Sequence, residues 1–572
     1  MPILLFLLGC TRPPAALDVR LDGAWHSDTR TVQLPTARGV PDTPFSRTIT
    51  VPVEWSGGAA ELELAATGWR VHVSLDGVEV GQATGGLWPA RVPITDRLKS
   101  GQHVLSFAVQ GPAPDNILPG STLQPVSGWV WGMPREGEQL ARGAITLRLG
   151  PARRIERVEA RLIDAGATVE ASAWTVGVEA GSSVALTLVR DGATALTLTG
   201  VVGEDGMARA TAPWTGPRWP DPGGLYTVTA DAGEGARRQA RIGLRASEPR
   251  ADGLYVNGVR TYVAASRLSV SEIGDRYALG RSARVLASEG ANAAELHGEV
   301  VPPWFFDAAD ELGLPIVLTP RCDGQRVQGG RAVEVPDSAE HQAFVDAGDR
   351  LARDALRSHP SILLWTIEAP LQDGHPHDPE YAVDGLPVLD EHENSNFPEP
   401  TLPPRGIPRG KTAFYGELPW VTTDAPGFSF AERLARVFAA NVATGDGLVL
   451  PAINRSANVA QDRAQIHDAI VAAGIPQLRV DPERRGISTL LVRVSAAGKP
   501  VEGAALVLEL PGQFPVGAFS DAVGIGAFEV DYAGDATVRV VGGAPTPVHL
   551  TPGVWRPGEW APNASTIGLT LP

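Results

Sequence analysis

The sequence predicts a multidomain protein in which β-sandwiches flank an α/β barrel. A chain of 572 residues exceeds one ordinary hydrophobic core, so several domains are expected. Its 64 Gly and 49 Pro are the residues that form tight turns between strands. The hydrophobic pattern changes from strict alternation to a helical period of about 3.6 beyond Val263, and alternation returns after about Arg485. Sandwiches should therefore lie on both sides of a central α/β region.

The composition excludes several classes of protein. Hydrophobic residues make up 43% and charged residues 20% of the chain, which favours globular domains over disorder. Lys and Arg total 49 against 65 Asp and Glu, and no basic run is present to neutralise a phosphate backbone, so nucleic acid is not an expected partner. Cys10 and Cys322 are too few for a disulfide framework.

The N-terminus is a short apolar stretch that ends in a cysteine. Residues 1–11 resemble a bacterial lipoprotein signal with Leu7-Leu8-Gly9-Cys10 as the lipobox, which makes Cys10 the lipidated residue and residues 1–20 a signal and linker. A plain secretory signal or a chance apolar start is the alternative, because the positive n-region is missing. No later segment has the roughly 20 apolar residues of a membrane helix. We expect a lipoprotein of the cell envelope that contacts the membrane through its lipid anchor only.

Residues 21–150 and 151–250 each contain short runs of alternating polarity. Examples are residues 45–51, 61–64, 71–75 and 104–109, with turn residues such as Asp76-Gly77 between them. Two β-sandwiches are predicted here.

Ordered motifs within these two blocks are similar to the opening domains of glycoside hydrolase family 2. Leu21-Asp22-Gly23-Ala24-Trp25, then Val51–Trp55, Gly68-Trp69 and Val71–Gly81 resemble its jelly-roll sugar-binding domain. Residues 214–228, with Trp219-Pro220 at their centre, resemble its immunoglobulin-like domain, and residues 254–260 resemble the hairpin that leads into its barrel. The resemblance implies a β-galactosidase, β-glucuronidase or β-mannosidase-like chain with a (β/α)8-type TIM barrel.

Residues 251–485 show the repeated α-then-β units of such a barrel. Predicted helices at residues 277–290, 304–313 and 340–356 alternate with apolar strands at residues 292–297, 315–319 and 362–367. The length is near the low end for eight units, and the stretch between Glu368 and Lys411 is short for two of them. We therefore expect a reduced barrel.

Residues 486–572 return to alternating strands. They resemble a bacterial immunoglobulin-like or carboxypeptidase-regulatory-like module, which predicts a C-terminal immunoglobulin-like β-sandwich without chemistry of its own.

A retaining glycosidase uses two carboxyl groups roughly 5–5.5 Å apart, and on a barrel they lie at the C-terminal ends of strands. Ser358–Trp365 is similar to the family stretch that precedes the acid/base, but Ala369 and Pro370 stand where the resemblance implies Asn and Glu. Glu368, two positions before the missing glutamate, is the candidate replacement acid. The alternative is an inward polar residue paired to a cation in the barrel.

Residues 411–420 look like the nucleophile strand of the family, in which a lysine opens an apolar strand that ends in glutamate. Glu417 is thereby the candidate nucleophile. An ordinary carboxylate at a strand end is the alternative.

Four further residues are candidates for substrate binding. The resemblance implies His297 and His392 at the sugar site, although Glu295 occupies the position where the family has an arginine. A structural role for His297 and a polar surface loop around His392 are the alternatives. Trp365 and Trp420 are candidate stacking platforms, with burial in the core as the default alternative. No ligand spacing fits a metal site, even around His375, His377 and Asp378, and no cofactor is expected.

Two functions follow from these residues. The first is retaining hydrolysis of a β-linked galactoside, glucuronide or mannoside. The second is that of a catalytically inactive carbohydrate-binding or scaffold lipoprotein derived from the family. A carbohydrate is the expected partner in both cases, while the oligomeric state is left open.

Overall fold

The computed structural model describes most of the chain outside the barrel and the framework of the barrel itself. The described residues are 16–28, 30–36, 43–68, 70–110, 141–250, 253–261, 263–268, 270, 273–288, 290–297, 301–319, 325–328, 331–334, 339–368, 388–391, 414–415, 447–450, 467–468, 471, 478, 483–557 and 559–571. None of the helices within these ranges is long and apolar enough to cross a membrane.

The N-terminal domain is a sandwich of two antiparallel layers, as the alternation predicts. Its first layer has the strand order β3 (Thr31–Leu34), β2 (Gly23–His26), β4 (Phe45–Val51), β9 (Gly101–Gln110), β6 (Arg70–Leu75), β7 (Val78–Thr84). Its second layer contains β1 (Leu17–Arg20), β10 (Ile145–Gly150), β5 (Ala59–Leu64) and β8 (Ala90–Pro93), and a short 3-10 helix, η1 (Val53–Trp55), precedes β5. Inward side chains of both layers, including Trp25 and Phe107, share one core.

Two predicted hairpin turns have the backbone that their residues favour. Asp76 and Gly77 between β6 and β7 have φ values of 52° and 77°, and Asn257 and Gly258 have values of 53° and 83°. Positive φ at both central positions defines the type I′ turn, which Asx-Gly pairs adopt at least cost.

The second domain is also β-rich. Its strand order is β11 (Arg154–Ile163), β12 (Thr168–Val176), β15 (Met207–Pro213), β14 (Ala193–Val202), β13 (Ser183–Arg190), β16 (Leu225–Asp231), β17 (Arg237–Gly243), with η2 (Asp164–Gly166) after β11. Trp214 packs edge-on against Tyr226 at a ring separation of 5.3 Å in its core. The predicted signature at Trp219 lies instead at the edge of this domain, where the indole Nε1 donates to the backbone oxygen of Asp310 at 2.9 Å.

The third region is a closed ring of parallel strands. The ring contains β21 (Ala264–Arg267), β22 (Ala293–His297), β23 (Ile316–Thr319), β26 (Ile362–Glu368), β27 (Val388–Glu391), β28 (Phe414–Tyr415) and β29 (Gly447–Leu450). Three helices accompany it, α1 (Arg276–Ser288), α2 (Pro303–Leu312) and α3 (Ala339–Leu356), together with the hairpin β24 (Gln325–Gln328) and β25 (Arg331–Glu334). Over the described residues this is a seven-stranded barrel with few helices, so the predicted (β/α)8 arrangement is not shown.

The residues of the ring divide into two clusters because successive side chains of a strand point to opposite faces. Ala294, Leu296, Leu318 and Trp365 pack with the helices in one cluster. Ala265, Ala293, Val317, Leu363 and Leu364 pack in the other with Leu254 and Val256, which belong to the three-stranded sheet β18 (Ser247–Arg250), β19 (Gly253–Val256), β20 (Val259–Thr261). That sheet immediately precedes β21, so it closes the N-terminal end of the barrel.

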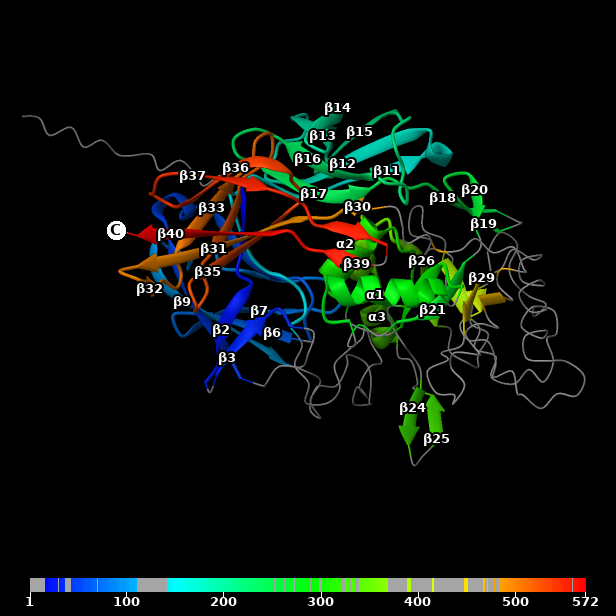
Figure 1. Ribbon diagram of the computed structural model, residues 1–572, viewed down its shortest axis with the longest axis horizontal. Helices are drawn as coiled ribbons and strands as arrows, with labels where there is room; N and C mark the ends of the chain where they lie inside the picture. Colours follow the sequence, from blue (N-terminus) through cyan, green and yellow to red (C-terminus); the bar gives the residue numbers. More distant parts are fainter. Residues whose placement is uncertain are drawn as a thin grey trace, which may run out of the picture.

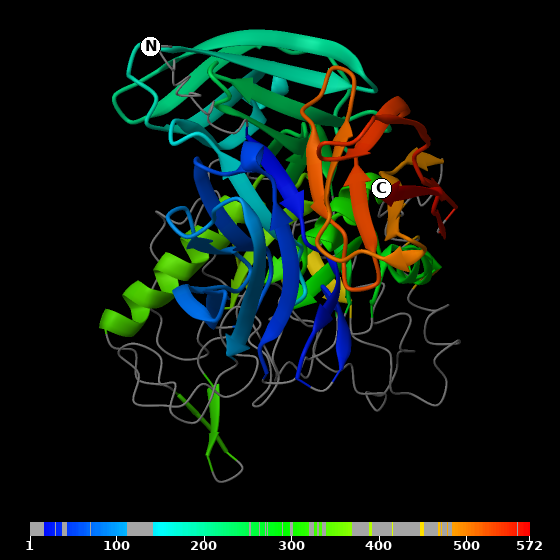
Figure 2. The same ribbon diagram turned by 90° about the vertical axis from the view of Figure 1, so that its left-hand side faces the viewer.

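The C-terminal region is a sandwich that shares a sheet with the N-terminal domain. One layer contains β32 (Lys499–Pro500), β31 (Ser488–Ala496), β35 (Ile525–Val530) and β40 (Ala564–Leu571). The other contains β33 (Ala505–Glu509), β34 (Val516–Phe519), β36 (Gly534–Val540) and β37 (Thr546–Leu550). Strand β34 pairs in parallel with β1, so one eight-stranded sheet runs from β37 to β8. Figures 1 and 2 show blue strands from the start of the chain beside orange strands from its C-terminal region.

Buried polar contacts reinforce this shared sheet. The Asp521 carboxylate accepts a hydrogen bond from the backbone N–H of Ala24 at 3.0 Å, and Gly23 leaves the space that this carboxylate fills. Arg47, which is 1% exposed, donates to the backbone oxygens of Leu21 and Phe519. The C-terminal module is thus an integral part of the fold.

The C-terminal region also reaches the barrel. Strands β30 (Arg484–Arg485), β38 (Val554–Arg556) and β39 (Glu559–Ala561) form a small sheet. Its Trp555 and Trp560 are buried in the same cluster as the inner faces of α1 and α2. The end of the chain therefore covers helices that begin far earlier in the sequence, at Arg276 and Pro303.

One carboxylate joins three of these parts. Glu311 of α2 is fully buried and contacts Arg241 of β17 at 2.5 Å and Arg276 of α1 at 2.9 Å. The indole Nε1 of Trp555 donates to the same carboxylate at 3.0 Å. A buried charge is stable only when it is paired and hydrogen-bonded, and Glu311 meets that requirement with groups from three domains.

We predict that Glu311→Gln destabilises the whole chain. The change leaves the buried guanidinium groups of Arg241 and Arg276 without their shared counter-charge, a loss of about 3–5 kcal/mol. Denaturant unfolding followed by tryptophan fluorescence would measure it. Glu559→Gln is the matched control, because the pair between Arg284 and Glu559 is exposed and contributes at most about 1 kcal/mol. Equal unfolding midpoints for the two variants would contradict the role of Glu311.

Candidate active site

The candidate active site lies at the C-terminal ends of the barrel strands, which all point the same way. Glu295 of β22 is 0% exposed and stands in register with Val317 of β23. Ala293 stands two positions before Glu295 on the same strand. Ala293 and Val317 both belong to the cluster that packs with Leu254 and Val256, here called the interior cluster. Because every second side chain of a strand points to the same face, Glu295 occupies an interior position. A fully buried glutamate thus occupies the position where the resemblance implies an arginine.

Strand β22 ends at His297. Its backbone is in register with Thr319, the last residue of β23. Because His297 stands two positions after Glu295, the two residues share the interior parity of the strand. The backbone thus puts His297 at the C-terminal rim, where a substrate-binding residue is expected.

Strands β26 and β27 bring two glutamates into register. Glu368 ends β26 and is paired with Glu391, which ends β27. Adjacent strands lie about 4.8 Å apart, and residues in register share a face of the sheet. Four positions separate Glu368 from Leu364 of the interior cluster, so both glutamates occupy interior register positions at the rim.

Glu391 is the residue that the sequence reasoning did not select. It stands immediately before His392 in the polar stretch Asp390–His392. The apolar pair Val388-Leu389 is followed by Asp390-Glu391. This pattern is typical of a strand that ends in a carboxylate. The register with Glu368 required the three-dimensional structure, because residues 369–387 intervene.

Several predicted site residues lie outside the described residues. They are Glu417, His392, Trp420 and the lipidation candidate Cys10. Strand β28 ends at Tyr415, two positions before Glu417, and the ring order places β27 between β26 and β28.

Trp365 is a core residue in this structure. It is 1% exposed, it belongs to the cluster between the barrel and the helices, and the Arg353 guanidinium lies 5.5 Å from its ring centroid. Its register partner Leu318 belongs to the same outer cluster. The indole of Trp365 is therefore buried between the barrel and the helices, on the side away from the barrel interior. This agrees with the alternative of burial in the core.

The N-terminal end of β26 is held by Asp310 of α2. One carboxylate oxygen of Asp310 accepts from the backbone N–H of Ser361 at 2.9 Å, and the other contacts Nδ1 of His359 at 2.8 Å. Burial disfavours the charged imidazolium, but the carboxylates of Asp310 and Asp307 outweigh it and raise the pKa of His359. The His-Pro-Ser-Ile motif thus anchors the strand that carries Glu368.

The second domain contributes to the same anchor. Arg245 donates to the backbone oxygens of Pro360 and of Ile362, the latter at 3.0 Å. Pro360 packs directly on Gly243, where any side chain would collide with the proline ring. The start of β26 is therefore clamped from outside the barrel.

Asp307, Asp310 and His359 also form the one group of possible metal ligands within the described residues, with ligand atoms within 4.8 Å of one another. Their geometry fits a hydrogen-bonded network better than a cation site. Asp310 already uses both oxygens, and burial raises the pKa of Asp307 toward its neutral form. We assign these residues a structural role.

The comparisons with known proteins relate this fold to sugar hydrolases. No protein-family profile matches the chain, and no curated protein sequence matches it. Among solved structures, a β-glucuronidase of an uncultured Clostridium sp. is similar at a TM-score of 0.58 and 12% identity, covering 80% of this chain and 89% of its own. A GH2 β-galacturonidase from Eisenbergiella tayi bound to galacturonate gives 0.55 and 14%, with coverages of 76% and 90%.

A third structure extends the similarity to the C-terminal module. An FMN-binding β-glucuronidase from Faecalibacterium prausnitzii L2-6 has a TM-score of 0.56 at 14% identity and covers 94% of this chain and 98% of its own. That coverage exceeds the share of the chain before residue 486. The chain therefore has the multidomain fold of the GH2 β-glucuronidases, including at least part of the C-terminal sandwich.

The network at the base of β26 predicts a pH-dependent stability. Because the pKa of His359 is raised in the folded protein, its contribution to the free energy of unfolding is complete below the ordinary value of 6.5 and is lost as the pH rises through the folded value. We expect His359→Asn to flatten the decline in stability as the pH rises above 6.5, measured by denaturant unfolding. The exposed pair of His549 and Asp535 supplies the control His549→Asn, which should follow the wild-type profile. Parallel profiles for wild type and His359→Asn would rule this out.

Proposed function

We propose that this protein is a retaining β-glycosidase of the glycoside hydrolase family 2 type that acts on β-linked uronides, within the wider set of galactosides, glucuronides and mannosides that the sequence predicts. The observation that carries the proposal is the carboxylate register of Glu368 and Glu391 at the rim of a closed parallel barrel. The fold supports it, because the solved structures of similar fold include β-glucuronidases and a β-galacturonidase.

The proposed chemistry uses Glu417 as the nucleophile. Its carboxylate attacks the anomeric carbon while a carboxylic acid protonates the leaving glycosidic oxygen, which forms a covalent glycosyl-enzyme. The same acid residue, now a carboxylate, takes a proton from the water that hydrolyses this intermediate. Glu368 is our first choice for that residue and Glu391 is the alternative. His297, His392 and Trp420 would bind the sugar.

The remaining elements of this proposal are a barrel completed to eight βα units and a membrane tether. The first rests on the predicted α/β alternation of residues 251–485. The second rests on Leu7-Leu8-Gly9-Cys10, with lipidated Cys10 anchoring the chain in the cell envelope.

A catalytically inactive carbohydrate-binding or scaffold protein is the second candidate. Two features favour it: Ala369 and Pro370 stand where the family has Asn and Glu, and a fully buried Glu295 replaces the expected arginine. Such a protein would keep the layout without the acid/base.

We predict that the purified chain hydrolyses an aryl β-glucuronide or β-galacturonide and that Glu417→Gln lowers kcat/KM by on the order of a thousandfold or more, since the variant cannot form the covalent intermediate. A panel of aryl β-glycosides assayed by released phenol would measure it. Glu559→Gln, at an exposed position of β39 paired with Arg284 of α1, should keep full activity. Turnover by Glu417→Gln equal to that of wild type would eliminate residue 417 as the nucleophile.

The acid/base residue can be identified by how the activity of its variant depends on the leaving group of the substrate. A leaving group of low pKa needs no protonation, so the correct variant should lose far less activity on an activated aryl glycoside than on an alkyl glycoside. We expect this selective loss, at least about tenfold in ratio, for Glu368→Gln and not for Glu391→Gln. The opposite result would transfer the role to Glu391, whereas equal losses on both substrates would argue against either residue.

If no glycoside of the panel is hydrolysed, binding separates the two candidate functions. Calorimetric titration with glucuronate and with β-glucuronides would detect a retained sugar site. Binding without turnover supports the inactive carbohydrate-binding protein, and neither binding nor turnover overturns both candidates.

A further inference from the structure

The last strand of the chain, β40, lies at the edge of a sheet. It pairs in parallel with β31 from Ala564 to Leu571, and its other side pairs with no strand of the described part of the chain. Figures 1 and 2 show this strand, in red, at the outside of the molecule. About half of its backbone N–H and C=O groups point away from β31, where a further strand can bind them.

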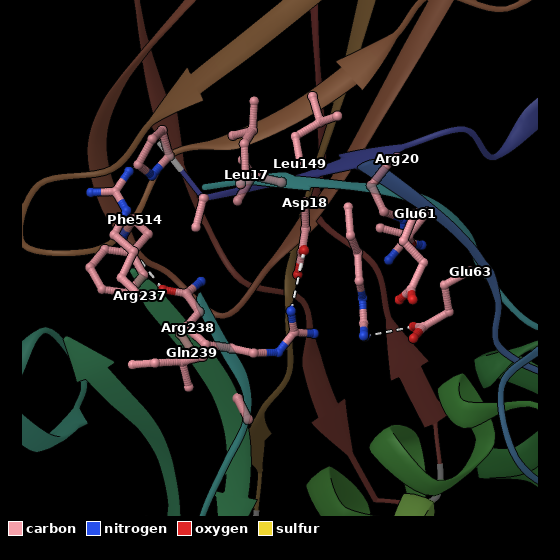
Figure 3. A pocket seen from close by; sticks show the side chains of 18 of the residues that line it. Leu17, Asp18, Arg20, Glu61, Glu63, Leu149, Arg237, Arg238, Gln239 and Phe514 are labelled. Atoms are coloured by element: carbon pink, nitrogen blue, oxygen red, sulfur yellow. Dashed lines mark hydrogen bonds and ion pairs between the residues drawn. The ribbon is translucent and has the colours of Figure 1, made fainter. Parts of the chain in front are cut away.

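The opposite layer of the same sandwich is closed on the side of the N-terminal domain. There β34 pairs with β1, and Asp18 and Arg20 of β1 line a cavity of about 490 Å³ at the junction of the domains (Figure 3). Charged side chains around this cavity pair with one another, since Glu63 accepts from Arg91 at 2.8 Å and from Arg148 at 2.7 Å. Partners within the molecule thus cover that edge, whereas the described residues supply none for the outer side of β40.

The other edge strands of the N-terminal and C-terminal sandwiches carry features that hinder pairing with another chain. Strand β8 contains Arg91 and Pro93, β37 contains Pro547, β35 contains Glu529 and β7 contains Glu79. Strands β3 and β32 have only four and two residues. Charged side chains, prolines and short length are the usual protections of a sheet edge.

Strand β40 has none of these protections. Its eight residues include no charged side chain and no proline, and they follow β31 without a register shift. A long, regular and uncharged edge of this kind pairs readily with another strand. The contrast with the protected edges indicates that a partner strand covers β40.

The side chains of β40 define which partner fits. Ile567, Leu569 and Leu571 pack against the core of the C-terminal sandwich and are only partly buried there. Thr566 and Thr570 are exposed on the opposite face. A partner strand must therefore alternate apolar and small polar residues in the same phase. A second β40, antiparallel about a two-fold axis perpendicular to the sheet, meets this requirement by symmetry, because equivalent faces then lie side by side.

The charge of the protein also favours a second copy at this strand. The formal net charge of the chain is −16, so two copies repel each other over much of their surfaces. Strand β40 adds nothing to this repulsion, and the one charged residue of its neighbour β31 is a cation, Arg493, in register with Gly568. An uncharged strand also offers no specific attraction to a charged peptide.

We propose that β40 is a homodimer interface, in which the β40 strands of two copies pair antiparallel and join their sheets. With Gly568 on the two-fold axis, Thr566 of one copy faces Thr570 of the other, and Ile567 faces Leu569. A single strand pair belongs with the interfaces below about 1,200 Å², so the dimer is expected to dissociate on dilution.

Sedimentation velocity of the intact chain over roughly 1–100 μM tests the proposal. We expect the wild type to show a monomer–dimer equilibrium. Gly568→Lys should raise the dissociation constant roughly tenfold or more, because it brings the ammonium groups of the two copies together. A Cβ at position 568 meets no atom within 4 Å, so the fold has room for this side chain.

Three further variants separate pairing at β40 from other causes of association. Gly568→Ala, at the same position but without charge, should dimerise as the wild type does. Val201→Lys adds the same charge to β14 at a position that is 57% exposed, and it should also dimerise. A mixture of Gly568→Lys with Gly568→Glu should associate more tightly than either variant alone, because opposite charges then face each other.

Circular dichroism and thermal unfolding verify that each variant is folded. The proposal is overturned if the wild type stays monomeric up to about 100 μM, or if folded Gly568→Lys dimerises as the wild type does. A mixture that associates no better than its two components would also overturn it. None of these measurements depends on hydrolysis, so their outcome is independent of the proposed function.

Discussion

The buried carboxylate of Glu311 is the interaction on which the arrangement of the domains depends. Arg241, Arg276 and Trp555 reach it from the second domain, the first barrel helix and the C-terminal hairpin. Its neighbour Asp310 fixes the start of β26 through His359 and Ser361 and accepts the Trp219 indole on its backbone oxygen. The last turn of α2 therefore links the barrel to the sandwiches, and a charge buried this deeply must keep all of these partners.

This dependence makes the sandwiches part of the barrel's support. Arg245 clamps the same strand from the second domain, and the parallel pairing of β1 with β34 ties the C-terminal module to the N-terminal sheet. Both ion pairs and shared apolar clusters join the domains. Arg241 pairs with Glu311 across the junction of the second domain and α2, while Phe519 of the C-terminal region packs in the N-terminal core. Trp555 and Trp560 pack in the same apolar cluster as α1 and α2.

The barrel rim combines retained and altered features. The strand that carries Glu368 is firmly anchored at its base, although the residues implied for the acid/base are replaced by Ala369 and Pro370. Glu391 in register with Glu368 offers a second carboxylate on a neighbouring strand. Loss of one acid at a strand end is therefore compatible with a barrel that keeps carboxylates at its rim.

The sequence by itself determined local elements: the alternating strand at Phe45–Val51, the turns at Asp76-Gly77 and Asn257-Gly258, and the helix α2, which is capped by Gly313. These follow from periodicity and from backbone preferences, which act over a few residues. Only the tertiary structure decided that Trp365 faces the helices, that Glu391 aligns with Glu368 and that β34 extends the sheet of β1. Those outcomes depend on contacts between residues far apart in the chain, because periodicity identifies which side of an element is buried but not which partner buries it.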